Sequence, residues 1–215
     1  MELPNRVYHL AEASNWLSIQ RHGLLSANNL FDLAGLLGGD RKQLEWQQRR
    51  QHIELPNGVQ IRDQRPMPPA GLEACLVGMT PAEWYGLINA RVFFWLDPDR
   101  LNRQRAACEP RPQVVLTVAT AALVARYSKQ LEITPINTGN ARRRPARRGA
   151  ATFVPYAAWI KSGCASEAAA LGTPERSRSR LPAELTVVGS VPDVMQLVVG
   201  VSELAAGQSF APSRV

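Results

Sequence analysis

Two side chains capable of acid–base chemistry stand in predicted strands near opposite ends of the chain. His9 lies in the apolar run at residues 7–11, and Glu184 begins the run at residues 184–188. A carboxylate at the head of an apolar strand must be hydrated at a sheet edge, paired, or turned into a cleft, because burying an unpaired charge is costly. Glu184 is therefore a candidate acid or base, while strand alternation leaves a solvated position equally open. A lone histidine such as His9 more often has a structural role.

Arginine offers the second kind of chemistry. The chain has 25 Lys+Arg against 18 Asp+Glu, and nearly all of the cations are arginines. A guanidinium binds phosphate through two parallel hydrogen bonds, so Arg49 and Arg50 are candidates for holding a pyrophosphate, or else form a solvated helix end. A second cluster would clamp an anionic polymer, or form a solvated loop. It comprises Arg142, Arg143, Arg144, Arg147 and Arg148.

Length and composition set the class of protein. A chain of 215 residues with 45% hydrophobic residues is expected to form one domain, residues 1–215, around a buried core. We see no apolar run near the roughly 18 residues that cross a bilayer, and the N-terminus lacks the basic-then-apolar layout of a signal peptide. We therefore expect a cytoplasmic protein with no membrane partner.

The cysteines and glycines narrow the chemistry further. Three widely separated cysteines predict reduced thiols and no disulfide framework or zinc knuckle, so no metal site is expected. They are Cys75, Cys108 and Cys164. The sequence carries neither the Gly-rich Rossmann fingerprint nor a P-loop, so any nucleotide must be bound by other means.

Short strands and helices must position these residues. The run at 7–11 leads into a helix at 16–22 that Ser14 or Asn15 caps and Gly23 ends. Apolar spacing and capping signals predict further helices at 28–48, 72–76, 81–89, 100–107 and 120–127. β-Branched and aromatic runs predict strands at 53–55, 59–64, 91–96, 114–118, 131–134, 184–188 and 195–199.

The order of these elements indicates the fold class. Short strands mixed with short helices, without regular βαβ alternation, predict an α+β domain with short flanking helices. Two segments break the pattern. Residues 137–149 are rich in Gly, Pro and Arg and predict a mobile basic loop, and residues 162–180, rich in Ala, Ser and Arg, also predict a flexible segment.

Spaced motifs from about residue 7 to 199 occur in an order that resembles the DarT-type ADP-ribosyltransferases. The chain resembles more closely still an uncharacterised bacterial family related to them. The motifs are Tyr8-His9-Leu10; Asn15, Ile19 and Gly23-Leu24-Leu25; Arg49-Arg50; Val92-Phe93-Phe94-Trp95; and Ala183-Glu184-Leu185 with Val191-Pro192. This resemblance implies an ADP-ribosyltransferase-like split β-sheet core.

The resemblance also implies a role for each motif, with NAD as co-substrate. His9, with Leu10, would contact the adenosine ribose of NAD, and Glu184 would be the catalytic carboxylate. Arg50, helped by Arg49, would meet the pyrophosphate and assist at the acceptor. The nicotinamide would lie against one of two aromatic rings. These are Phe93 and Phe94.

The residue types suit this chemistry. Cleavage of the nicotinamide–ribose bond produces an oxocarbenium-like centre that a nearby carboxylate stabilises. Arginine clusters and aromatic residues suit a single-stranded nucleic acid, so we expect transfer to a DNA or RNA base. The resemblance extends to a toxin or phage-defence effector, with an antitoxin protein as a partner left open.

Several alternatives remain. The family usually has Thr two residues after the histidine, where this chain has Ala11, and a degenerate module that only binds nucleotide or nucleic acid would explain that difference. The acceptor could instead be a protein. RNA 2′-phosphate transfer is the third alternative, because it needs basic residues such as Arg50 at phosphate and no strand carboxylate.

Overall fold

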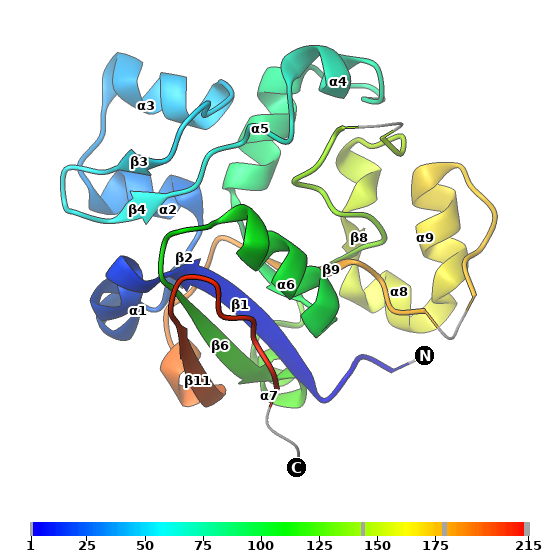
Figure 1. Cartoon of the computed structure of the whole chain (residues 1–215). Coiled ribbons are helices and arrows are strands. Elements are labelled where there is room, and N and C mark those ends of the chain that lie inside the picture. The colour runs from blue at the N-terminus through cyan, green and yellow to red at the C-terminus, as the bar shows by residue number, and fades with distance from the viewer. Residues whose placement is uncertain (1, 143–144, 178–179, 213–215) are drawn as a thin grey trace.

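The computed structural model describes residues 2–142, 145–177 and 180–212 (Figure 1). Its centre is a seven-stranded sheet in which every neighbouring pair of strands is antiparallel. The strands are β1 (Arg6–Glu12), β5 (Arg91–Trp95), β6 (Gln113–Ala119), β7 (Leu131–Thr134), β8 (Val154–Pro155), β9 (Glu184–Val188) and β11 (Val198–Leu204). They lie in the order β11-β6-β1-β5-β9-β7-β8. The expected α+β class is confirmed.

Two small sheets and several helices surround this sheet. The small sheets pair β2 (Leu24–Leu25) with β10 (Ser190–Val191), and β3 (Ile53–Glu54) with β4 (Gln60–Ile61). The α-helices are α1 (Trp16–His22), α2 (Ala27–Leu33), α3 (Gly38–Trp46), α4 (Pro69–Glu73), α5 (Pro81–Asn89), α6 (Pro98–Ala107), α7 (Thr120–Tyr127), α8 (Tyr156–Ser162) and α9 (Cys164–Leu171). In the view of Figure 1, α2 and α3 (blue) lie on one side of the molecule and α8 and α9 (yellow) on the other.

Short 3-10 turns complete the chain at η1 (Ala13–Asn15), η2 (Ala150–Thr152) and η3 (Val194–Gln196). Within the part of the chain that the structure describes, none of the helices is both long and apolar enough to cross a bilayer. The three cysteines are buried free thiols.

Local sequence explains where some of these elements begin and end. Thr80 caps α5 by accepting a hydrogen bond from the Glu83 N–H at 3.3 Å, and the Glu83 carboxylate accepts one from the Thr80 N–H at 2.6 Å. Gly23 ends α1 with a φ of +74°, and a Cβ placed there would lie 2.4 Å from Pro192. Only glycine therefore fits at this contact, which holds the end of α1 against the chain that leaves β10.

Several predicted elements differ from the structure. The helix predicted at 72–76 is α4, at Pro69–Glu73, and the strand predicted at 59–64 is only β4, at Gln60–Ile61. The predicted helix at 28–48 is two helices, because the chain turns at Gly35, whose φ is +69°, before α3 begins. We expected a flexible segment at 162–180, but α9 occupies part of it. The predicted strand at 195–199 begins only at Val198, since η3 takes up the preceding residues.

The two central strands, β1 and β5, pair at one position only. β1 pairs with β6 along its whole length, from Arg6 to Glu12. β5 pairs with β9 at all five of its residues. Between β1 and β5 the register contains the single pair Tyr8 and Trp95. The sheet therefore consists of two well-paired halves joined at this pair.

Alternation along the strands sorts the side chains onto two faces. Val7, Phe94 and Leu185 belong to the main core on one face. Tyr8 and Trp95 lie on the other face, in a second core that α6 covers. Both faces of the central strands are thus buried.

Candidate functional site

Glu184 is the first residue of β9 and lies between two strands. Its register partners are Trp95 on β5 and Thr134 on β7. The side chain is only 4% exposed. The solvated strand position that the sequence left open is therefore excluded, and this carboxyl group stands inside the protein, at the end of the sheet where β5 and β7 finish.

Two threonines hold the Glu184 carboxyl group through one oxygen. The Thr134 and Thr138 hydroxyls donate to Oε2 at 2.9 and 2.8 Å, and the Thr138 N–H donates to it at 3.2 Å. Burial raises the pKa of Glu184 to about 7, although these three hydrogen bonds oppose the shift. At neutral pH this group can therefore both accept and donate a proton.

Glu184 differs from the other glutamates that are buried in the described part of the chain. Glu12 is 3% exposed and forms ion pairs with arginines, and Glu167, at 2%, pairs with Arg176 at 2.6 Å. From the described residues, Glu184 accepts hydrogen bonds from neutral groups alone. A perturbed carboxyl group without a cation in contact is a better candidate for chemistry than an ion-paired one.

Cations do act on Glu184 from farther away. Arg100, on α6, favours the ionised carboxylate electrostatically, and Arg148 interacts with it in the same sense. Arg148 also donates to the backbone oxygen of Thr138 at 3.3 Å. Since Thr138 in turn bonds to Glu184, Arg148 supports the carboxyl group through this threonine.

His9 lies where β1 and β5 separate. Its Nδ1 is 2.8 Å from the backbone oxygen of Phe93, so the ring reaches across to the neighbouring strand. A carbonyl oxygen only accepts, so Nδ1 carries the hydrogen and Nε2 is left as an acceptor. Burial lowers the pKa of His9 to about 4, which keeps the imidazole neutral at pH 7. The ring also meets that of Phe94 edge-on, with centroids 5.8 Å apart.

His9 and Glu184 lie close along the sheet but not in contact. Tyr8, Trp95 and Glu184 form one register row across three adjacent strands. The backbones of β1 and β9 are thus about 10 Å apart, or two strand spacings. His9 follows Tyr8 and so starts from the opposite face. A ligand that contacts both side chains must therefore extend past the junction of the two halves.

The structure separates the roles of the two adjacent arginines. Arg49 is buried, and its guanidinium donates to the backbone oxygens of Leu44 and Arg62 and to the Asn89 side chain. Burial lowers the pKa of Arg49 to about 10. Arg49 is thus committed to holding the fold, which corrects its expected place at a pyrophosphate, whereas Arg50 is exposed.

The other predicted contacts also divide into buried and accessible ones. Phe94 is fully buried and Leu10 is 6% exposed, both in the core. Phe93 is half-buried on the opposite face from Phe94. Of the two aromatic candidates, the structure therefore leaves Phe93 better placed to meet a ligand.

The predicted basic loop is not uniformly solvated. Arg148 is 3% exposed, with its guanidinium 5.7 Å from the centroid of the Trp84 ring. The expectation of a solvent-facing arginine there is corrected, because the aromatic face and backbone oxygens satisfy this cation. Arg142 and Arg147 are exposed. The remaining two predicted cations lie outside the described residues. They are Arg143 and Arg144.

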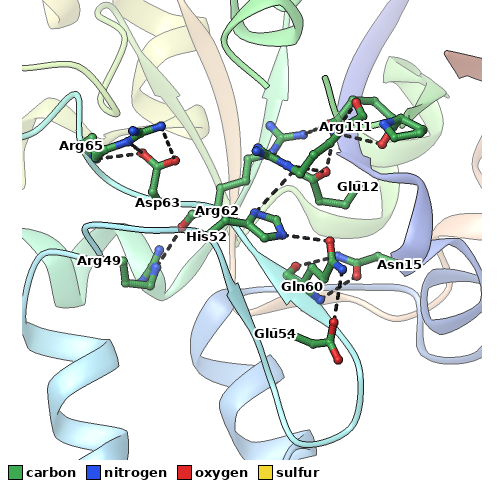
Figure 2. Close-up of polar contacts among 12 residues, drawn as sticks. Glu12, Asn15, Arg49, His52, Glu54, Gln60, Arg62, Asp63, Arg65 and Arg111 are labelled. Carbon is green, nitrogen blue, oxygen red and sulfur yellow. Dashed lines mark hydrogen bonds and ion pairs between the residues drawn. The ribbon is translucent and has the colours of Figure 1, made fainter. Parts of the chain in front are cut away.

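Three residues near the candidate site were missed from the sequence. Thr134 and Thr138 bond to Glu184, as described above. The third is Arg62, whose charge contributes to lowering the pKa of His9. Figure 2 shows Arg62 pointing toward Glu12, with which it forms an ion pair at 3.2 Å. A threonine near a predicted strand end is too common a signal to single out.

Two surface clefts lie near the first half of the chain. One has a volume of about 600 Å³ and is bounded by α3, α5 and the segment after α3, including Arg50. The other, of about 310 Å³, lies beside Glu12 and Arg111. Neither is lined by His9 or Glu184. Among the described residues, no group of three or more His, Cys, Asp or Glu side chains is arranged to hold a metal ion.

Comparison with known proteins gives a family. A family model with the description "Family of unknown function (DUF7002)" matches residues 5–198. The chain belongs to the DUF7002 family. No curated protein matches it. The match covers most of this DUF7002 member and includes both His9 and Glu184.

Proposed function

We propose that the protein is an NAD-dependent ADP-ribosyltransferase that transfers ADP-ribose to a nucleic-acid base. The observation that carries the proposal is the state of Glu184. It is a buried carboxyl group held by two hydroxyls, without a cation in contact among the described residues, and its pKa is raised to about 7. A group in this state can serve as a base and can stabilise developing positive charge.

The hydrogen bonds of Glu184 suit that role. They all end on Oε2, and among the described residues we find none to Oε1. Oε1 would face the ribose of NAD as the nicotinamide–ribose bond breaks and positive charge develops at the ring carbon. Thr134 and Thr138 would fix the orientation of the carboxylate during that step. Glu184 would then accept a proton from the attacking base.

His9 would bind the other end of NAD. Its neutral ring presents Nε2 as an acceptor, which suits a ribose hydroxyl. Arg62, rather than Arg49, is the guanidinium whose charge reaches His9, and Arg50 is accessible on the surface. Since Arg62 is engaged with Glu12, Arg50 is the guanidinium that would meet the pyrophosphate. A dinucleotide that contacts both residues, His9 and Glu184, would have to extend from β1 to β9 past the junction of the two sheet halves, because these residues start from opposite faces.

The acceptor is proposed from charge. The chain has a net charge of +7, and Arg142 and Arg147 are exposed. Such a surface attracts a phosphate polymer more strongly than it attracts most proteins. Modification of DNA or RNA would act as a toxin or a defence against phage, and an antitoxin would then be the natural protein partner.

The test is release of nicotinamide from NAD in the presence of DNA oligonucleotides, RNA oligonucleotides or a bacterial protein extract. Glu184→Gln is expected to lower release by about 10²–10⁴-fold, the range for loss of a general base. Glu203→Gln, an exposed glutamate on β11, is the matched control and should retain activity. Circular dichroism checks that both variants fold.

Each other outcome contradicts part of the proposal. Labelled ADP-ribose found on polypeptide alone would show that the acceptor is a protein and not a nucleic acid. NAD binding without nicotinamide release, with every polymer present, would indicate a module that only binds. RNA 2′-phosphate transfer that survives Glu184→Gln but not Arg50→Ala would indicate the phosphotransferase alternative.

A further inference from the structure

The cleft of about 600 Å³ is lined by neither His9 nor Glu184, and of the residues given a role in the proposed function only Arg50 borders it. Its volume falls in the range of about 300–1,000 Å³ that is typical of ligand sites. It lies between α3 and α5 and is bounded by the chain that follows α3. Its lining is rich in amide and aromatic groups. These groups include Gln43, Trp46, Gln47, Gln51 and Tyr85, and Arg50 borders the cleft beside them.

The walls of this cleft are fixed by internal hydrogen bonds. Arg49 joins Leu44 to Asn89 through bonds of 3.1 and 2.9 Å, which ties α3 to the end of α5. Tyr85 donates to the backbone oxygen of Met67 at 2.7 Å. The cleft is therefore formed before any ligand arrives, which lowers the entropy cost of binding.

Trp46 supplies an open aromatic surface. Its ring packs against Gly86, where a Cβ would lie 2.7 Å from Cζ3 of the tryptophan. A glycine inside a helix is unfavourable, but here it lets the ring lie directly on α5. The side chain nevertheless remains 42% exposed. A large aromatic ring held on one side and open on the other is suited to stacking with a base.

Three amide side chains of the cleft are unengaged, and the lining carries positive charge. Gln43, Gln47 and Gln51 are exposed, and within the described residues we find no side-chain hydrogen bond for them. An amide offers both a donor and an acceptor, as base edges require. Arg50 adds an exposed guanidinium. Every cleft-lining residue in the described part of the chain is neutral or basic, which favours a phosphate-bearing ligand.

We propose that this cleft binds a segment of single-stranded nucleic acid, with a base stacked on Trp46 and a backbone phosphate at Arg50. The role of that strand as acceptor rests on the proposed function, but its binding does not. A duplex keeps its bases stacked and paired, so only an unpaired base can reach both the ring and the amides.

The experiment measures fluorescence anisotropy of labelled 12-nucleotide DNA and RNA strands and of the matching duplex, without NAD. We expect the single strands to bind more tightly than the duplex. Trp46→Ala should weaken binding by about tenfold, in line with loss of one stacking contact. Arg50→Ala should weaken it by about tenfold and lower the slope of log K against log salt by about one.

Two controls locate the site. Lys42→Ala removes an exposed cation on the same helix, α3, outside the cleft lining, and should change affinity less than twofold. The double variant Arg142→Ala/Arg147→Ala tests the basic loop. In that background, Trp46→Ala should still weaken strand binding by about tenfold. Melting curves of each variant confirm folding.

The proposal is overturned if the strands fail to bind at low salt, or if duplex binds as tightly as single strand. It is also overturned if the loop variant abolishes binding while Arg50→Ala and Trp46→Ala keep it. Because the binding assay contains no NAD, strand binding in it combined with no nicotinamide release in the separate NAD assay would reject the transferase and leave the cleft standing. Nicotinamide release without strand binding in the anisotropy assay would reject the cleft alone.

Discussion

Two buried glutamates in this protein have similar exposure and opposite surroundings. Glu12, at the end of β1, forms ion pairs with Arg62 and Arg111, both at 3.2 Å, and accepts a hydrogen bond from Gln113. Glu184, at the start of β9, accepts bonds from two hydroxyls and one N–H. Figure 2 shows the cationic groups that converge on Glu12.

This difference separates a structural carboxylate from a candidate for chemistry. The arginines around Glu12 compensate its charge and connect β1 to the segment that carries Arg62, so its negative charge is part of the fold. Hydroxyls orient Glu184 but do not supply a positive charge, and burial then raises its pKa. Burial alone therefore does not identify a candidate site; the kind of hydrogen-bond partner does.

The largest effect on stability is expected at Glu12. Glu12→Gln should lower the free energy of unfolding by about 3 kcal/mol, because it leaves two guanidiniums without their carboxylate. This is the low end of the range for breaking a buried pair, since Arg62 and Arg111 are 21% and 31% exposed. The melting temperature at pH 7 should fall by about 6–12 °C for a protein of this size. An unchanged melting curve would show that the ion pairs do not stabilise the fold.

Glu184→Gln is expected to change the free energy of unfolding by a nearly equal amount, but in the stabilising direction and only at high pH. Between pH 4.5 and about 7 the folded protein retains a proton that the unfolded chain has released. The contribution of this group to stability is therefore fully favourable below pH 4.5 and falls as pH rises through 7, by about 3 kcal/mol. Glu184→Gln should remove this loss and be more stable than the parent protein at pH 8.

Denaturant unfolding at pH 4.5 and pH 8 checks this prediction as a difference between parent and variant. The difference matters because His9 acts in the other direction. Its lowered pKa makes its contribution rise with pH between about 4 and 6.5. That contribution is present in both proteins and cancels. If the difference does not change with pH, Glu184 does not titrate where we expect.

A smaller effect is expected from the hydroxyls. Thr138→Val removes a hydrogen bond of 2.8 Å from the ionised form of Glu184, which raises the pKa of that carboxyl group further. The acidic limb of the pH–rate profile for nicotinamide release should move to higher pH. The rate at pH 6.5 should fall by about tenfold, the equivalent of one charged hydrogen bond. A lower rate with an unmoved limb would mean that Thr138 has only a structural role.

The sequence predicted those elements whose signals are local. The capping box of α5 lies within four residues, and β5 is a run of aromatic and β-branched residues. The start of β11 was misplaced because its pairing with β6 decides it, and that strand lies some 80 residues earlier. Local propensity does not include such a partner.

The same difference between local signals and distant partners explains which residues of the candidate site the sequence predicted. Glu184 stood out because a carboxylate in an apolar strand is locally inconsistent. Thr138, its main partner, is 46 residues away and sits in a segment that reads as an unstructured basic loop. The burial of Arg148 likewise depends on Trp84, on a different helix. Partners brought together by the fold leave little trace in a local pattern.

The single pairing position between β1 and β5 has a consequence for how the protein opens. Each half of the sheet can lose its amide protons to solvent without breaking the ladder of the other half. Native-state hydrogen exchange should therefore show amides of β11, β6 and β1 in one protection group and those of β5, β9 and β7 in another. The imidazole of His9 is bonded to the backbone oxygen of Phe93 and so lies at the junction between the two halves of the sheet.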